Sequence, residues 1–171
     1  MSRSATEASF DPAQQLAIIQ RALAKQSFCV LATSSVDHRP HAVGVVYASV
    51  GLDLYLLVNE NTIKVRNIRE NPRVAICIPV RKYPAGPPMA VQFQGTAEIL
   101  APDDPVITQL RAAGRLKRIV GLGAERKPNM CFLKVTPYRR ISSYGLGVPL
   151  LRLIRDVSLG QRSVPVPDRS T

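Results

Sequence analysis

The sequence predicts a mainly β protein in which six or seven antiparallel strands form a small closed or half-closed barrel, with helices only at the connections. Short apolar or alternating segments recur along the chain and are separated by turn residues, as in all-β proteins. The chain has 171 residues, enough for one hydrophobic core without disulfides or metals. No stretch approaches the roughly 18 uninterrupted apolar residues of a membrane-spanning helix.

The first half of the chain is expected to contain a packing helix, three strands and a short crossover helix. Leu16, Ile19 and Leu23 recur at helical spacing, which predicts an amphipathic helix. Three apolar segments follow, and because only short turns join them they are expected to form an antiparallel meander. The first helix covers 12–26, the strands cover 28–33, 41–49 and 53–58, and the crossover helix lies within 59–72.

The second half is expected to add four strands and two helices. A long alternating segment predicts a strand that bends at Gly95, and two strands are expected on either side of Pro137. The strands cover 73–80, 89–100, 129–136 and 138–144, one helix covers 103–120, a Pro-rich loop covers 81–88, and Pro149 opens a short final helix.

The predicted organisation is one folded domain with two terminal segments. Residues 1–11 are expected to form a flexible N-terminal tail, residues 12–147 the barrel domain, and residues 148–171 a basic C-terminal extension whose Pro- and Ser-rich end, 160–171, should fray. The N-terminus lacks the apolar core of a secretory signal, and the three cysteines form no CxxC pair. We therefore expect a cytoplasmic protein with reduced thiols.

Positive charge is concentrated toward the C-terminus. The formal net charge is +11, and residues 111–171 hold 13 basic and 3 acidic side chains, a net charge of +10. Such an imbalance implies an anionic partner, which could be a polyphosphate, a polycarboxylate, a nucleic acid or an anionic lipid.

Side chains that carry chemistry by themselves are scarce. The sequence contains no GxSxG, GxGxxG or P-loop pattern, and no cysteine sits beside a histidine. His38 and His41 flank a turn without an acidic partner at metal-binding spacing, so no metal site is expected. If the protein is an enzyme, we expect no catalytic side chain: a cofactor must carry the reaction, and the protein supplies binding, orientation and exclusion of water.

The segment 59–74, NENTIKVRNIRENPRV, has the residues of a phosphate site. Thr62 can cap a short helix that Pro72 ends, and Lys64 and Asn67 are three residues apart, so they share a helical face. A helix N-terminus with a lysine in its first turns offers N–H groups, a dipole and an ammonium group to one anion. The alternative interpretation is a solvated, arginine-rich surface helix.

Three segments stand out along the chain: LATSSVDHRPHAVGVVYAS, NTIKVRNIRENPRVAICIPV and VQFQGTAEIL. In their order and spacing they resemble the FMN-binding split-barrel superfamily, which is also called pyridoxamine 5'-phosphate oxidase-like and includes flavin- and deazaflavin-dependent oxidoreductases. The resemblance extends over about 28–144, and its most specific part is T-x-K-x-R-N-I-R-x-N-P-R-V, from Thr62 to Val74. It implies a Greek-key-like split β-barrel that binds its cofactor at a homodimer interface.

The resemblance also implies roles for individual residues. Lys64 corresponds to the lysine that contacts the cofactor phosphate, and 41–46 corresponds to the strand beside the flavin ring. Arg66 is a motif member that could equally pair with Glu70. Where the vitamin-processing oxidases read roughly RVEG this chain reads FQG, which argues against pyridoxamine phosphate as the substrate. The implied cofactor-binding residues are Asn59, Asn61, Thr62, Lys64, Arg66 and Asn67 near the phosphate, and His41, Val43, Val45 and Val46 along the ring, with ordinary barrel core as the alternative role for each valine.

FMN and the deazaflavin F-420 both agree with this resemblance. F-420 also carries a phosphodiester and a polyglutamate tail, and its carboxylates suit arginine side chains. Arg111, Arg115 and Arg118 fall on one side of the expected helix, and Arg139 and Arg140 are further candidates. The basic C-terminal third therefore favours F-420 slightly over FMN.

Three functions follow from these observations. We favour an oxidoreductase in which FMN or F-420 transfers hydride or electrons to a small organic substrate, because a phosphate motif occurs without catalytic side chains. The alternative is a non-enzymatic protein of the same fold that binds a flavin, haem or a bile pigment. A nucleic-acid or membrane-surface module ranks third: PLLRLIRD could lie on anionic lipid, but the chain has no Trp and only 5% aromatic residues, which disfavours base stacking.

Overall fold

The computed structural model describes residues 10–80 and 88–168, apart from the side chains of residues 122 and 124. Most of the predicted N-terminal tail and of the predicted loop at 81–88 therefore lies outside the described residues.

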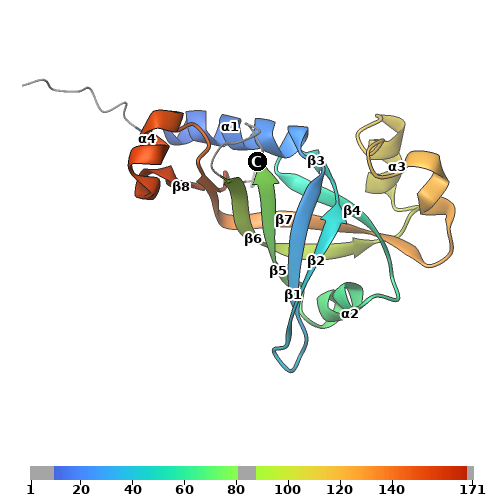
Figure 1. Ribbon diagram of the computed structural model, residues 1–171. Coiled ribbons are helices and arrows are strands. Elements are labelled where there is room, and N and C mark those ends of the chain that lie inside the picture. Colours follow the sequence, from blue (N-terminus) through green and yellow to red (C-terminus); the bar gives the residue numbers. More distant parts are fainter. Residues whose placement is uncertain (1–9, 81–87, 169–171) are drawn as a thin grey trace, which may run out of the picture.

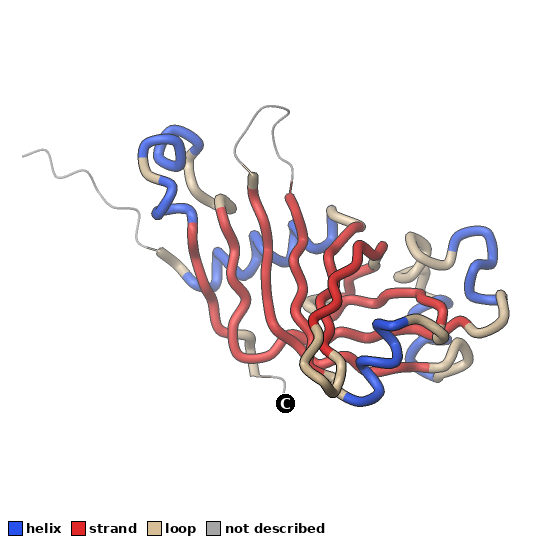
Figure 2. The backbone as a smooth tube through the Cα atoms, turned by 60° about the horizontal axis from the view of Figure 1, so that its bottom comes forward, coloured by secondary structure: helices blue, strands red, loops and turns tan. Residues whose placement is uncertain are grey.

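The described strands form one antiparallel sheet that curls into a half-barrel, so the predicted mainly β, split-barrel fold is confirmed (Figures 1 and 2). The strand order is β2-β1-β5-β6-β7-β4-β3, with β8 paired to β7. Neighbours such as β1 and β5 are distant in sequence, as in a Greek key. The described residues contain eight strands rather than six or seven: β1 Phe28–Ser34, β2 Pro40–Val46, β3 Ala48–Val50, β4 Asp53–Asn59, β5 Arg73–Val80, β6 Met89–Leu100, β7 Met130–Tyr144 and β8 Gln161–Pro165.

The expected strand at 41–49 is interrupted at Tyr47, which is fully buried. Before Tyr47 the chain pairs with β1, and after it the chain pairs with β4. The Tyr47 backbone N–H donates to Ser27 O (2.8 Å), and its hydroxyl donates to Leu23 O (3.0 Å). The two end strands of the sheet, β2 and β3, are therefore separated by one residue of chain.

The expectation of two strands around Pro137 is wrong, because β7 is continuous from Met130 to Tyr144. Its register against β6 shifts between Phe93 and Gly95. A Cβ atom at Gly95 would lie 2.5 Å from the Thr136 carbonyl oxygen, so only glycine permits this close approach. The shift accommodates Pro137 within the strand.

Helices close the two ends of the barrel (Figure 1). One end is covered by α1, whose Ile19 and Leu23 are completely buried, and Asp11 caps this helix by accepting from Ala13 N (2.9 Å). The other end is covered by α2, which buries Val65 and Ile68. The bounds are Pro12–Lys25 for α1 and Ile63–Glu70 for α2.

The expected helix at 103–120 is wrong beyond Ala112, where α3 (Pro105–Ala112) ends. Gly114 has φ +68°, which stops the helix. Gly114 N donates to Arg111 O (2.9 Å) and Arg115 N donates to Leu110 O (2.9 Å), the bond pair of a Schellman motif. Turns follow up to the 3₁₀ helix η1 (Gly121–Arg126).

The C-terminal segment is more ordered than expected. The predicted final helix is present as α4 (Leu150–Arg155), and a 3₁₀ helix, η2 (Val157–Gly160), follows it. The expectation that 160–171 frays is wrong for β8, because its backbone pairs with β7 and Val164 is 1% exposed.

Two apolar clusters stabilise the fold. The larger one fills the barrel beneath α1 and α2, and the smaller one packs Ile107 and Leu116 against Tyr55 and Phe132. No helix within the described residues is long and apolar enough to cross a membrane.

Candidate functional site

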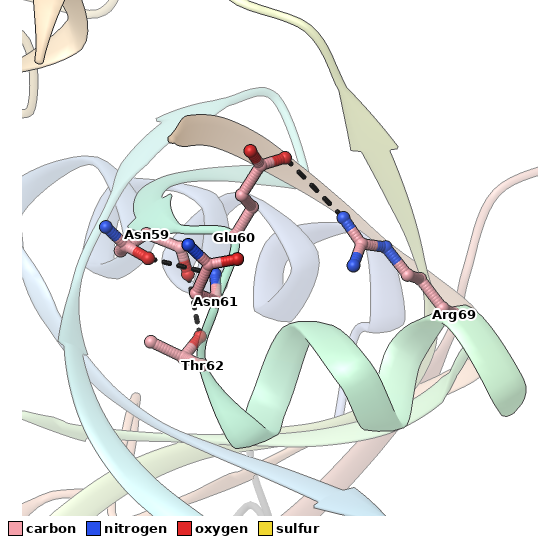
Figure 3. A network of polar contacts seen from close by, with 5 residues as sticks. All are labelled: Asn59, Glu60, Asn61, Thr62 and Arg69. Carbon is pink, nitrogen blue, oxygen red and sulfur yellow. Dashed lines mark hydrogen bonds and ion pairs between the residues drawn. The ribbon is translucent and has the colours of Figure 1, made fainter. Parts of the chain in front are cut away.

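The first turn of α2 is open to a ligand. Thr62 occupies the N-cap position, but within the described structure no side chain caps this helix. Instead the Thr62 hydroxyl donates to Asn59 O (2.8 Å), so the prediction that Thr62 caps the helix with its side chain is wrong (Figure 3). Free N–H groups at a helix start, together with the helix dipole, favour an anion.

A polar loop precedes this helix and is tightly organised (Figure 3). Asn61 N donates to Asn59 Oδ1 (2.9 Å), and Glu60 forms an ion pair with Arg69 (Nη2 to Oε2, 3.5 Å). A hollow of about 260 Å³ opens here, lined by Glu60, Asn61, Thr62, Arg66 and Arg69. The structure thus brings together four of the residues implied for the phosphate region: Asn59, Asn61, Thr62 and Arg66.

Lys64 is half-buried in the first turn of α2 and does not line this hollow, because it lies on a different face of the helix from Arg66 and Arg69. Burial raises the pKa of the Cys131 thiol, and Glu60 raises it further, whereas Arg69 and Lys64 lower it. Cys131 lies in β7 (Met130–Tyr144), which pairs with β4 just before the loop that leads into α2. The predicted pairing of Arg66 with Glu70 is not formed among the described residues, where Arg69 pairs with Glu60 instead.

Asn67 shares the inward face of α2 with Lys64, as the spacing predicts, but it is 3% exposed. Its Nδ2 donates to Thr33 Oγ1 (3.0 Å), and Thr33 Oγ1 donates to the His41 carbonyl oxygen (3.5 Å). The amide therefore links α2 to β1 and, through Thr33, to β2. Asn67 therefore lies inside the protein and does not line the hollow.

The residues implied along the flavin ring lie on two faces of β2. His41, Val43 and Val45 are half-buried on the inner face, and Val45 packs against the core. Val46 is 49% exposed on the outer face, because side chains alternate along a strand. The structure therefore does not bring Val46 together with the other three.

A second hollow lies on the outer face of the sheet and was not predicted as a unit. It has a volume of about 570 Å³, with a floor of small apolar side chains and a polar rim. Tyr138 donates to Gln94 Oε1 (3.1 Å), and Arg140 Nε and Nη2 donate to Ser163 Oγ and O (2.9 and 2.7 Å). The sequence signal that could have predicted this hollow is the alternation along β1, β5 and β6, which places every second side chain on the outer face of the sheet. The floor comprises Val30, Ala32, Ala75 and Cys77, and the rim includes Gln92, Gln94, Tyr138, Arg139 and Arg140.

The predicted arginine stripe does not exist, because α3 ends before two of its members. Arg111 pairs with the buried Glu125 (3.1 Å), and Arg118 donates to the carbonyl oxygens of Ala24 (3.1 Å) and Gln26. Because these two arginines bind groups of the chain itself, much of the sequence-based argument for F-420 over FMN no longer holds.

The curled antiparallel half-barrel, with an open helix start at its mouth, defines a split-barrel protein. The family model described as pyridoxamine 5'-phosphate oxidase matches residues 17–142, and the chain belongs to that family. No curated protein matches the chain.

Several solved structures share the fold. A haem-binding protein from Mycobacterium smegmatis is 19% identical with a TM-score of 0.68, over 92% of this chain and 59% of that protein. An FAD-binding protein from Mesorhizobium loti is 20% identical with a TM-score of 0.60, over 73% of this chain and 88% of that one. An F420 reductase is 22% identical with a TM-score of 0.51, over 69% of this chain and 91% of that one.

Proposed function

We propose that the protein is an oxidoreductase that binds the phosphate of a flavin-type cofactor, FMN or F-420, at the start of α2. The chain's family and the FAD- and F420-related neighbours support this class of cofactor. When bound, such a cofactor supplies the hydride transfer that no side chain of the site can perform. The protein contributes binding, orientation and exclusion of water.

The observation that carries the proposal is the uncapped N-terminus of α2. Thr62 turns its hydroxyl back to Asn59 O, which leaves the first N–H groups of the helix available to a phosphate. Lys64 would add an ammonium group beside the same helix start, and Asn59 and Asn61 would border the phosphate. His41 and Val43 on the inner face of β2 would lie along the ring.

A second copy of the chain is proposed as the partner that completes the site. Phe28 and Val46 are opposite each other in the β1–β2 register and are 48% and 49% exposed on the outer face. The Phe28 ring lies over Gly44, where a Cβ atom would be 2.6 Å from it. This apolar sheet face continues into the hollow floored by Val30 and Ala32, and a homodimer contact would cover it. We place this dimer in the cytoplasm, where its free cysteines stay reduced.

The test is titration of the purified protein with FMN and with F-420, followed by cofactor fluorescence. We expect binding of at least one of them, and Lys64→Ala should weaken it about tenfold or more, because an ammonium–phosphate bond is lost. Lys25→Ala, at the other end of the barrel on α1, is the matched control and should leave affinity unchanged.

Two results would overturn the proposal. One is the lack of binding of either cofactor below roughly millimolar concentration. The other is tight binding of haem, detected by its absorption spectrum, that Lys64→Ala does not alter; this would favour a haem-binding protein without flavin chemistry.

The choice between the two cofactors can be tested at the outer-face hollow. Arg139 is exposed, and Arg140 is held at its edge by Ser163. If the polyglutamate tail of F-420 reaches these guanidinium groups, Arg139→Gln with Arg140→Gln should weaken F-420 binding and spare FMN binding. Equal effects on both cofactors would remove these arginines from tail recognition.

A further inference from the structure

The segment from α4 to η2 exposes an unusual concentration of large aliphatic side chains. Leu151 is 74% exposed, Ile154 66%, Val157 64% and Leu159 51%. Four of the most exposed large apolar residues in the described chain thus lie within Leu150–Gly160. Large apolar side chains that are exposed together in one short segment point to an interaction site.

The segment is firmly anchored to the barrel, so its exposure is a property of the folded protein. Leu153 is 1% exposed, and Gly145 N donates to Gly160 O (2.9 Å). Asp156 accepts from Ser158 N (2.9 Å) and from the Ser158 hydroxyl (2.6 Å), which fixes the turn between the two helices. In both views α4 projects at the end of the sheet opposite α3 (Figures 1 and 2).

Arginines accompany the exposed aliphatic residues. At 100° per residue, Leu151 and Arg155 project away from the buried Leu153, with Ile154 on one flank and Arg152 on the other. Both arginines are exposed, and neither forms an ion pair within the part of the chain that the structure describes. Arginine can bury its aliphatic stem at an apolar boundary while its guanidinium reaches anionic groups.

A bilayer surface matches this arrangement better than another protein copy does. In a two-fold contact through α4, Arg152 and Arg155 of each copy would approach those of the other. A stable interface also needs about 800 Å² and 20–30 residues on each partner, whereas α4 and η2 have six and four residues. An anionic membrane accepts the apolar side chains at its headgroup boundary and attracts the cationic protein, whose net charge is +11.

We propose that α4 and η2 form a peripheral membrane-binding element that inserts Leu151, Ile154, Val157 and Leu159 into the headgroup region of an anionic bilayer. Arg152 and Arg155 contact the lipid phosphates. This inference is independent of cofactor binding, because the element lies away from α2 at the other end of the barrel (Figure 1).

The experiment uses a fluorescent reporter, since the chain contains no tryptophan. Leu151→Trp in the full chain is mixed with vesicles of phosphatidylcholine and phosphatidylglycerol in a ratio of about two to one. We expect a blue shift of the emission and quenching by brominated lipid. Val36→Trp is the matched control, because Val36 is also exposed (62%) but lies in the β1–β2 turn; its emission should not change.

Co-sedimentation of the otherwise unaltered protein with the same vesicles tests the individual groups. Leu151→Ser with Ile154→Ser, or Arg152→Gln with Arg155→Gln, should reduce binding about tenfold or more, while Val36→Ser with Arg39→Gln leaves it unchanged. Binding should also fall at high salt and with vesicles of phosphatidylcholine alone.

Three results would overturn the proposal. The first is no sedimentation of the unaltered protein with anionic vesicles, and the second is binding that survives both α4 double substitutions. The third is a blue shift of the Leu151→Trp variant that occurs without lipid and grows with protein concentration. This last result would assign the patch to a contact between copies of the chain.

Discussion

Asn67 Nδ2 donates a 3.0 Å hydrogen bond to Thr33 Oγ1, and this contact joins residues 34 positions apart in the sequence. Both side chains are at most 5% exposed. The bond ties the helix that carries the candidate phosphate site to β1, and Thr33 passes the link to the His41 carbonyl on β2. The distance between the helix start and β2 is thereby fixed inside the protein.

Removal of this link should destabilise the protein and loosen the site. Asn67→Ala should lower the free energy of unfolding by about 1–3 kcal/mol, because it deletes a buried hydrogen bond. Thr33→Val, which keeps the side-chain shape, should cost a similar amount by leaving the Asn67 amide unpaired. Urea unfolding of both single variants and the double variant is the measurement, and strictly additive losses would show that the two groups are not coupled.

Thr62 offers a way to separate helix stability from anion binding. Thr62→Asp should cap α2 and raise or maintain the free energy of unfolding, by up to about 1 kcal/mol. The same carboxylate should repel a phosphate and weaken FMN or F-420 binding more than about tenfold. Thr62→Asn is the control, since it caps without charge; equal affinities for the Asp and Asn variants would argue against an anion at this helix start.

The hydroxyl of Tyr47 should contribute measurably to stability. Tyr47→Phe removes the buried bond to Leu23 O, and we expect a loss of about 1–1.5 kcal/mol in the free energy of unfolding. Tyr138→Phe, which removes a bond to Gln94 near the surface, should change it by less than about 0.5 kcal/mol. A Tyr47→Phe variant as stable as the unaltered protein would mean that water replaces the lost donor.

Alkaline pH should destabilise the fold partly through Cys29. Burial, with a smaller effect of Cys77, raises the pKa of the Cys29 thiol from 9.0 to about 12. The folded state therefore favours the protonated thiol: this stabilisation is complete below pH 9 and is lost as the pH rises toward 12. Cys29→Ala should lose stability less steeply between about pH 9 and 11, by up to about 1.4 kcal/mol per pH unit. The measurement is the urea midpoint of the variant and of the unaltered protein across this pH range. If both midpoints fall equally steeply with pH, the effect does not come from Cys29.

Strands with strong alternation were predictable from sequence, and those created by tertiary pairing were not. The prediction for 89–100 matches β6 because alternation persists along it. The break at Tyr47 has no local signal, since it results from closure of the barrel under α1. β8 resembles a polar tail and becomes a strand only because β7 offers it a partner. Gly114 was a usable signal for the end of α3.

In the candidate site, the helical period predicted that Lys64 and Asn67 share one face of α2. It did not predict that Asn67 is buried inside the protein. The direction of the Thr62 hydroxyl could not be predicted, because threonine can accept from a helix N–H or donate to an upstream carbonyl with equal ease. The separation of Val46 from Val43 was predictable from period two alone. The roles of these residues in cofactor binding stay predictions.

The passage of the chain through Tyr47 also constrains how the barrel can open. Only one residue separates β2 from β3. A shift in the register of β2 against β1 would therefore also shift the register of β3 against β4, and the reverse. Unrolling the sheet from either side must also withdraw the Tyr47 ring from beneath α1. Sheet closure and docking of the N-terminal helix should therefore be lost together, in one cooperative transition.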